Sequence, residues 1–199
     1  MRTRLLLIAS TVFPIWVGAQ QPTATAEKQT ENSVAQTFRS FGRPYGAWLI
    51  AAFDSIPASK YAYKPTEVQQ SIGYIAQHLE NANYQLCALF GKTKYVMTAR
   101  DSLADTVKAK WPKDTLVARV KASLTFCGNE IAKLTDKDLA DEMKAGSPGA
   151  QVTVTRARYL ILLVTDLAEH YSQLAGYMRL IGMVPPSALP LSALPAPKR

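Results

Sequence analysis

The sequence is poor in the residues that most catalytic machinery uses. Its 199 residues include only two histidines and two cysteines. It contains no glycine-rich phosphate loop, no G-x-S-x-G elbow, and no serine, histidine and acid in a known triad order. Strand-like alternation is absent outside the loops, and no segment repeats. These absences argue against P-loop and serine-hydrolase chemistry and favour a helical fold.

Clustered positive charge is also missing. The formal net charge is +8, from 23 Lys and Arg against 15 Asp and Glu. The basic residues are scattered along the chain, with no zinc-finger, basic-zipper or ribonucleoprotein motif. Solubility alone accounts for such a surplus. We therefore expect no binding to nucleic acid.

Long apolar runs are absent after the first 19 residues. Residues 1–19 predict a secretory signal peptide, with Arg2 and Arg4, the apolar stretch 5–17, and small residues before the cleavage position. This stretch is short for a membrane span and contains Pro14, although an uncleaved anchor is the alternative. We expect a mature protein of net charge +6, exported to a bacterial periplasm or secreted, with no stable membrane anchor.

The remaining chain predicts one helical domain. Residues 20–30 form a flexible leader, 31–186 the domain, and 187–199 a disordered, proline-rich tail. Four segments carry apolar residues at helical spacing, namely 31–56, 71–90, 114–134 and 153–182. Four amphipathic helices in a chain of this size predict an all-α four-helix bundle. The first segment is either one helix kinked at Pro44 or two shorter helices.

The two cysteines lie on different predicted helices. Export permits a bridge between Cys87 and Cys127, which would close a loop of 40 residues. In the chain-entropy model such a loop contributes ~3–4 kcal/mol to stability. Two buried free thiols are the alternative, because the sequence does not give the Cα separation that a bridge requires.

The histidines mark the candidate site. Asp166 and His170 are one helical turn apart on the fourth helix, on an inward face that includes Leu163 and Leu174. An ionisable pair on such a face needs a partner, and a divalent cation is one. His78, beside the apolar stripe of the second helix, completes its coordination. In the alternative reading, His78 and Asp166 bond each other, or each bonds the backbone.

Several short pieces, in order, resemble the DinB-like superfamily of bacterial four-helix proteins over residues 38–187. The pieces are Tyr63-Lys64-Pro65-Thr66-Glu67-Val68, Ser71-Ile72-Gly73, Ala76-Gln77-His78-Leu79, Glu169-His170-Tyr171-Ser172-Gln173-Leu174, Tyr177-Met178-Arg179-Leu180 and Gly182-Met183-Val184-Pro185-Pro186. The resemblance implies an up-down-down-up bundle with a long crossover at residues 92–113. It also implies a divalent metal held by three histidines, one on the second helix and two, at i and i+4, on the fourth.

His78 and His170 match the outer two of these metal positions, whereas Asp166 stands where the family has the middle histidine. Two histidines and a carboxylate still suit zinc, nickel, iron or manganese. The departure equally fits a degenerate site. The resemblance includes thiol-S-transferases, but export argues against a cytoplasmic thiol cosubstrate.

Two functional hypotheses remain from the sequence. The first is an exported metal-dependent hydrolase or transferase acting on an unidentified small molecule, with Gln173 orienting His170, and Gln77 and Asn83 as substrate contacts. The second is a non-catalytic ligand-binding or structural envelope protein. Either could form a homodimer.

Overall fold

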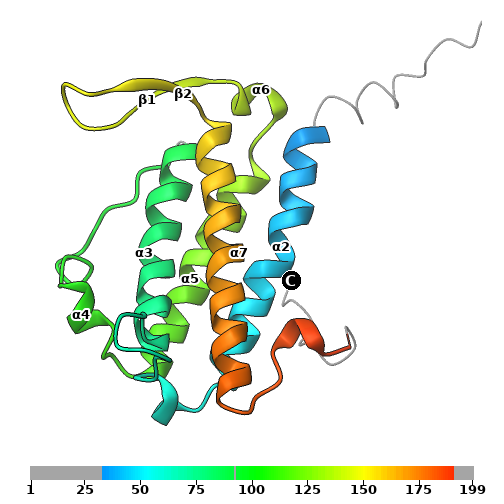
Figure 1. Cartoon of the computed structure of the whole chain (residues 1–199). Coiled ribbons are helices and arrows are strands. Elements are labelled where there is room, and N and C mark those ends of the chain that lie inside the picture. Colours follow the sequence, from blue (N-terminus) through cyan, green and yellow to red (C-terminus); the bar gives the residue numbers. More distant parts are fainter. Residues whose placement is uncertain (1–32, 92, 191–199) are drawn as a thin grey trace, which may run out of the picture.

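The computed structural model describes residues 33–91 and 93–190. Its elements, in chain order, are α2 (Ser33–Ser55), η1 (Ala58–Lys60), α3 (Ile72–Gly91), α4 (Asp105–Lys108), α5 (Lys113–Ala132), α6 (Asp136–Leu139), β1 (Glu142–Ala145), β2 (Val152–Thr155), α7 (Ala157–Leu180) and η2 (Pro186–Ala188) (Figure 1). The predicted signal peptide and leader lie outside the described residues, as does the tail from residue 191.

Helices α3 and α5 run parallel. The Cys87–Cys127 disulfide and the hydrogen bond from Asn83 Nδ2 to Ser123 Oγ join positions that advance together along the two helices. Parallel neighbours need a long connection, and residues 93–112 follow the length of the bundle between these helices (Figure 1). This is the crossover that the family resemblance implies.

Helix α7 runs antiparallel to α3 and parallel to α2. Arg156, at the start of α7, donates to the carbonyls of Leu89 and Phe90 at the end of α3. Trp48, in the second half of α2, packs on Tyr171 in the second half of α7 with ring centroids 5.2 Å apart. The four long helices therefore form the predicted four-helix bundle with up-down-down-up topology.

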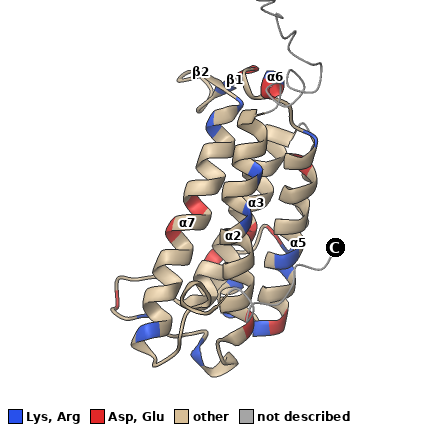
Figure 2. Ribbon diagram, turned by 90° about the vertical axis from the view of Figure 1, so that its right-hand side faces the viewer, with Lys and Arg blue, Asp and Glu red and all other residues tan. Residues whose placement is uncertain are grey.

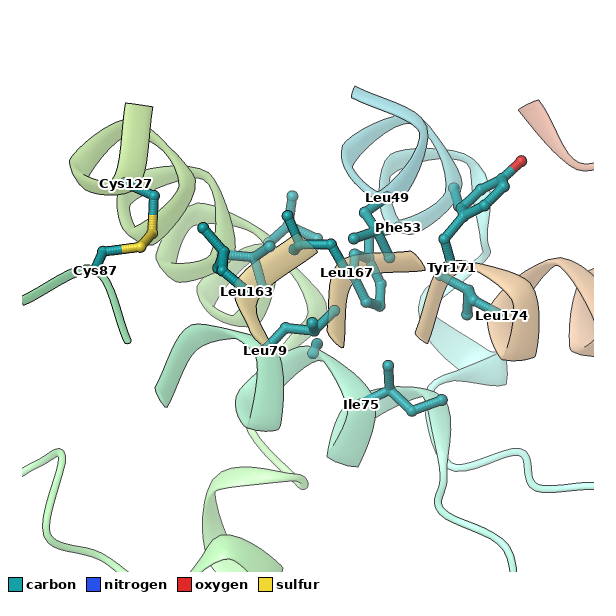
Figure 3. Close-up of a cluster of buried hydrophobic side chains, with 14 of the residues drawn as sticks. Leu49, Phe53, Ile75, Leu79, Cys87, Cys127, Leu163, Leu167, Tyr171 and Leu174 are labelled. Carbon is teal, nitrogen blue, oxygen red and sulfur yellow. A yellow bond between two sulfur atoms is a disulfide. The ribbon is translucent and has the colours of Figure 1, made fainter. Parts of the chain in front are cut away.

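Apolar side chains of all four long helices fill the bundle. Figure 3 shows leucines of α7 between residues of α2 and α3, with the disulfide at one side of the cluster. The largest fully buried side chains are Leu49, Phe53, Phe90, Ile56, Ile72, Ile75, Leu79, Leu116, Leu160, Leu163, Leu174 and Met178. The disulfide links α3 to α5 with 5.2 Å between its Cα atoms, so the cysteines are paired.

The start of the fourth helix was predicted wrongly. Residues 153–155, read as helix, belong to β2, which pairs antiparallel with β1 so that Val152 lies opposite Ala145 and Thr155 opposite Glu142. Alternating Val and Thr favour an extended chain because their branched side chains are restricted in a helix. The hairpin turn contains Gly146 with φ +106°, a conformation that favours glycine. Strand alternation was thus present but was assigned to a helix.

The first predicted helix is continuous. Helix α2 contains Pro44 in its interior, which resolves the choice between one helix and two. A proline there removes one backbone hydrogen bond. The carbonyl freed by Pro44 is that of Ser40, four residues earlier, and Ser40 is exposed, so water can satisfy it.

The surface carries charges of both signs. Among the described residues, Lys and Arg occur along the bundle with Asp and Glu between them, and they form no continuous basic stripe in Figure 2. No helix in the described part of the chain is both long and apolar enough to span a membrane. After α7 the chain turns back through η2, where the Ser187 amide donates to the Tyr171 hydroxyl at 2.7 Å.

Candidate metal centre

Three predicted ligands, from two antiparallel helices, converge. His78 lies on α3, and Asp166 and His170 lie one turn apart on α7. Asp166 Oδ1 is 3.5 Å from His78 Nε2 and 3.4 Å from His170 Nε2. The two imidazole rings approach edge to face, with centroids 4.7 Å apart. The carboxylate therefore lies between the two imidazoles.

The spacing fits a single cation. One ligand atom from each residue can be chosen so that all three lie within 4.8 Å of one another. Ligands at ~2.0–2.2 Å from a tetrahedral metal lie about 3.4 Å apart, which agrees with both carboxylate–imidazole separations. The cluster is half-buried, with His78 the most exposed of the three.

Gln173 fixes the orientation of His170. Its side-chain nitrogen donates to the Tyr177 hydroxyl at 2.9 Å, which leaves its oxygen to face His170 Nδ1 at 3.2 Å. Nδ1 is then the protonated nitrogen, and Nε2 turns its lone pair toward Asp166. Metal-ligating histidines are usually oriented in this way by a partner on the far nitrogen.

The electrostatics of the trio require a positive charge between these groups. A lone pair on His170 Nε2 facing a carboxylate is repulsive unless a proton or a metal ion lies between them. Burial lowers the pKa of His170, but its hydrogen bond and ion pair with Asp166 outweigh burial and raise it. Burial raises the pKa of Asp166, but the two imidazoles outweigh it and bring the pKa to about 2.

The second carboxylate oxygen supports a cation over a proton. Asp166 Oδ2 is fully buried and has no hydrogen-bond partner. A single proton shared with an imidazole leaves this oxygen unsatisfied, and an unsatisfied buried acceptor costs about 1–3 kcal/mol. A metal ion can be ligated by both oxygens of a carboxylate. The residues present therefore fit a bound divalent cation.

The two predicted substrate contacts do not face this cluster. Asn83 was assigned wrongly: its side chain is fully buried between α3 and α5, where it donates to Ser123. It lies five residues after His78, about 140° further around the helix. Gln77 is also fully buried, and its amide lies 3.1 Å from Asp105 and 3.2 Å from Asn81, so it tethers the crossover to α3.

The polar groups nearest His78 on the crossover were missed. A groove of about 350 Å³ is lined by His78, Asn81, Ala82, Gln85, Met97, Asp101, Ser102, Leu103, Asp105 and Lys108. Six of these ten residues belong to the segment between α3 and α5, two of them in the short helix α4. That segment has no apolar period, so the sequence carried no signal for which helix face it covers.

The fold is an up-down-down-up four-helix bundle with three candidate metal ligands on its second and fourth long helices. The model of the DinB superfamily matches residues 47–174, which is more than half of the chain. The chain belongs to the DinB superfamily. No curated protein matches its sequence.

Solved structures with this fold are distant in sequence. A conserved protein from Enterococcus faecalis has 15% identity and a TM-score of 0.57, covering 75% of this chain and 98% of its own. A DinB-like protein from Bacillus subtilis has 16% identity and a TM-score of 0.57, covering 74% and 93%. A mycothiol-dependent maleylpyruvate isomerase has 10% identity and a TM-score of 0.56, covering 71% of this chain and 59% of its own. At these identities the likeness establishes the fold alone.

Proposed function

We propose that the protein binds one divalent cation through His78, Asp166 and His170, and uses it for metal-dependent hydrolysis of a small molecule. The observation that carries the proposal is the convergence of the three ligand atoms within 4.8 Å on two different helices. Three protein ligands leave coordination positions open for substrate, as catalytic sites require and closed structural sites do not.

The chain's residues have distinct tasks at this site. Asp166 contributes the one negative charge, and Gln173 presents Nε2 of His170 to the cation. The core around α7 excludes water from one side of the cluster, which strengthens the electrostatic interactions there. A bound divalent cation supplies Lewis-acid polarisation of the substrate and an activated water.

Hydrolysis is favoured over thiol transfer because the chain is proposed to act outside the cytoplasm. The paired Cys87 and Cys127 support an oxidising compartment. A fusion of residues 1–32 to a reporter that is active only after export tests the proposed export. Retention of the reporter in the cytoplasm contradicts it.

Metal content tests the cation site directly. Protein purified without added chelator should contain about one divalent ion per chain by elemental analysis, and His78→Ala and Asp166→Ala should each lose it. Glu169→Ala is the matched control, since Glu169 is an exposed carboxylate beside His170. Metal-free wild-type protein that does not take up zinc, nickel, iron or manganese on reconstitution contradicts the proposal.

Activity is tested separately. The reconstituted protein should hydrolyse at least one compound in a panel of model esters, amides and phosphoesters, and chelation or Asp166→Ala should abolish the rate. Metal binding without turnover anywhere in the panel supports the second candidate, a non-catalytic binding protein. The raised pKa of His170 is consistent with this non-catalytic candidate, because a protonated His170 can pair with Asp166 when no metal is bound.

A further inference from the structure

The groove beside His78 has two walls of different origin. One wall is the face of α3 that carries His78, Asn81, Ala82 and Gln85, at i, i+3, i+4 and i+7. The other wall is the crossover between residues 97 and 108. Its volume of about 350 Å³ lies at the lower end of small-molecule pockets. His78 belongs both to this groove and to the metal centre.

The crossover wall is fixed in place by a buried ion network. Arg119 of α5 donates to Glu80 of α3 at 2.8 Å and also to Asp101 of the crossover. Asp101 is 4% exposed and accepts further hydrogen bonds from the Thr98 backbone, the Thr98 hydroxyl and the Tyr95 hydroxyl. A segment held by so many bonds is pre-organised, so ligand binding bears little ordering cost.

The same wall packs closely against the first turn of α3. A side chain at Gly73 would collide with the carbonyl oxygen of Ala109, just beyond α4. Glycine is thus required here for close backbone approach. The crossover and α3 are therefore in direct backbone contact at this turn.

The charge that reaches the groove is negative. Lys108 is 2% exposed, and its ammonium pairs with Asp105, 3.1 Å away, and donates to the carbonyl of Asp101. Asp101, Asp105 and Glu80 together carry three negative charges, against two positive charges on Lys108 and Arg119.

Asp105 has 46% of its side chain exposed. Its Oδ1 accepts from Lys108 and from the Gln77 amide, both at 3.1 Å, whereas its Oδ2 faces the Tyr74 hydroxyl at 3.5 Å. A carboxylate oxygen has about two acceptor positions, so Oδ2 retains capacity for another donor.

The groove also offers amide and apolar surface. Gln85 is exposed on the α3 wall, and Met97 and Leu103 on the crossover are 53% and 44% exposed. A ligand that suits all these groups carries a cationic hydrogen-bond donor and a short hydrocarbon part.

We propose that this groove binds a primary ammonium group on a small organic molecule, through Asp105 with Gln85 beside it. The inference deepens the proposed hydrolase function by naming the substrate class: an ester or amide whose ammonium end lies in the groove while its carbonyl end reaches the cation beside His78. Hydrolysis then adds water across the acyl bond and releases a carboxylic acid and an alcohol or amine, and the ammonium group held at Asp105 takes no part in the reaction.

The test uses n-butylammonium as the probe, with n-butyrate and n-butanol as matched controls for charge. Protein is treated with chelator, so that binding is measured without metal and its failure is distinct from failure of the metal centre. Chemical-shift titration of ¹⁵N-labelled protein should show millimolar binding of n-butylammonium alone, with shifts at the Asn81 and Gln85 side-chain amides.

Variants locate the binding. Asp105→Asn should weaken n-butylammonium binding about fivefold, the upper range for a partly exposed ion pair. Because that change can loosen the crossover, Gln85→Glu and Gln85→Lys give a second measurement on an exposed position, and should strengthen and abolish binding respectively. Asp54→Asn, an exposed carboxylate in the last turn of α2, is the control and should change nothing.

Three results overturn the proposal. The first is that n-butyrate binds as tightly as n-butylammonium. The second is that n-butylammonium does not bind at concentrations up to about 50 mM. The third is that Asp105→Asn and Gln85→Lys both bind n-butylammonium as the wild type does.

Discussion

A divalent cation added to the metal-free protein should raise its melting temperature, and Asp166 should determine the size of that rise. Asp166 Oδ1 lies within 3.5 Å of both imidazole nitrogens, so it is the central member of the proposed ligand set. Asp166→Ala leaves two imidazoles that belong to different helices and have no common negative partner.

The size of the rise in Tm follows from mass action. A cation at 100 times its dissociation constant stabilises the fold by about 2.7 kcal/mol. In a chain of this length each kcal/mol shifts Tm by roughly 2–4 °C, so the expected rise is about 5–11 °C. Mutating residues that merely orient a ligand costs roughly 10- to 100-fold in affinity, so losing Asp166 should cost at least that much. At the same cation concentration the variant then gains at most about 1.4 kcal/mol for a 10-fold loss and about 0.4 kcal/mol for a 100-fold loss, or roughly 1–6 °C.

The assay is differential scanning fluorimetry or circular dichroism with and without zinc, nickel, iron(II) or manganese. The rise is compared within each variant, so any change in the metal-free Tm cancels. Glu169→Ala should keep the full rise. An equal rise in Asp166→Ala and wild type refutes the assignment of Asp166 as a ligand.

Asp166→His provides the complementary test. It restores the three-histidine set that the family resemblance implies, and imidazole suits zinc and nickel better than manganese. The variant should therefore retain the rise in Tm with zinc and nickel and lose it with manganese. A variant that binds no metal at all shows that the two helices do not present three ligands to one point.

Three further predictions follow from other contacts. Reducing the Cys87–Cys127 disulfide, which spans 40 residues, should destabilise the protein by about 4 kcal/mol in the chain-entropy model and lower Tm by roughly 8–16 °C; an unchanged melting curve in reductant, with free thiols confirmed by labelling, contradicts this. Burial raises the pKa of Asp101, but its hydrogen bonds outweigh burial and hold the pKa at about 2, below the ordinary 3.8. Its stabilising contribution is therefore complete above pH 3.8 and is lost as the pH falls toward 2, by about 2 kcal/mol, so urea titrations of Asp101→Asn should lack this part of the acid dependence. Gln173→Leu should weaken metal binding roughly 10- to 100-fold without changing the metal's identity, whereas Gln173→Glu, which keeps an acceptor for His170 Nδ1, should retain most of the affinity.

The sequence predicted those parts of the fold that follow from helical period. The inward faces of the helices brought the three candidate residues together, and Asp166 and His170 share a face because residues at i and i+4 do so whatever the surrounding packing. Residues 153–155 were misassigned because the four alternating β-branched residues of β2 are too few to stand out against the longer apolar run of α7, and their pairing partner is ten residues away in an unpatterned segment.

Helical period could not predict the groove. Asn83 and Gln85 are two residues apart on α3, yet one is buried against α5 and the other faces the groove. Which polar side chain meets a neighbouring helix and which meets the crossover depends on bundle order. The family resemblance gave the topology, but not the path of residues 93–112 across α3.

Helix α3 carries both His78 and one wall of the groove. Its position relative to α5 is fixed on one side by the disulfide and on another by the Arg119 network. His78 is therefore held on a helix that cannot shift independently, while Asp166 and His170 depend on how α7 packs against it. The orientation of His170 is in turn set by Gln173 and Tyr177, further along α7. A change in the packing of α7 should therefore alter metal affinity, whereas a change on the crossover should alter the groove and leave the three ligands in place.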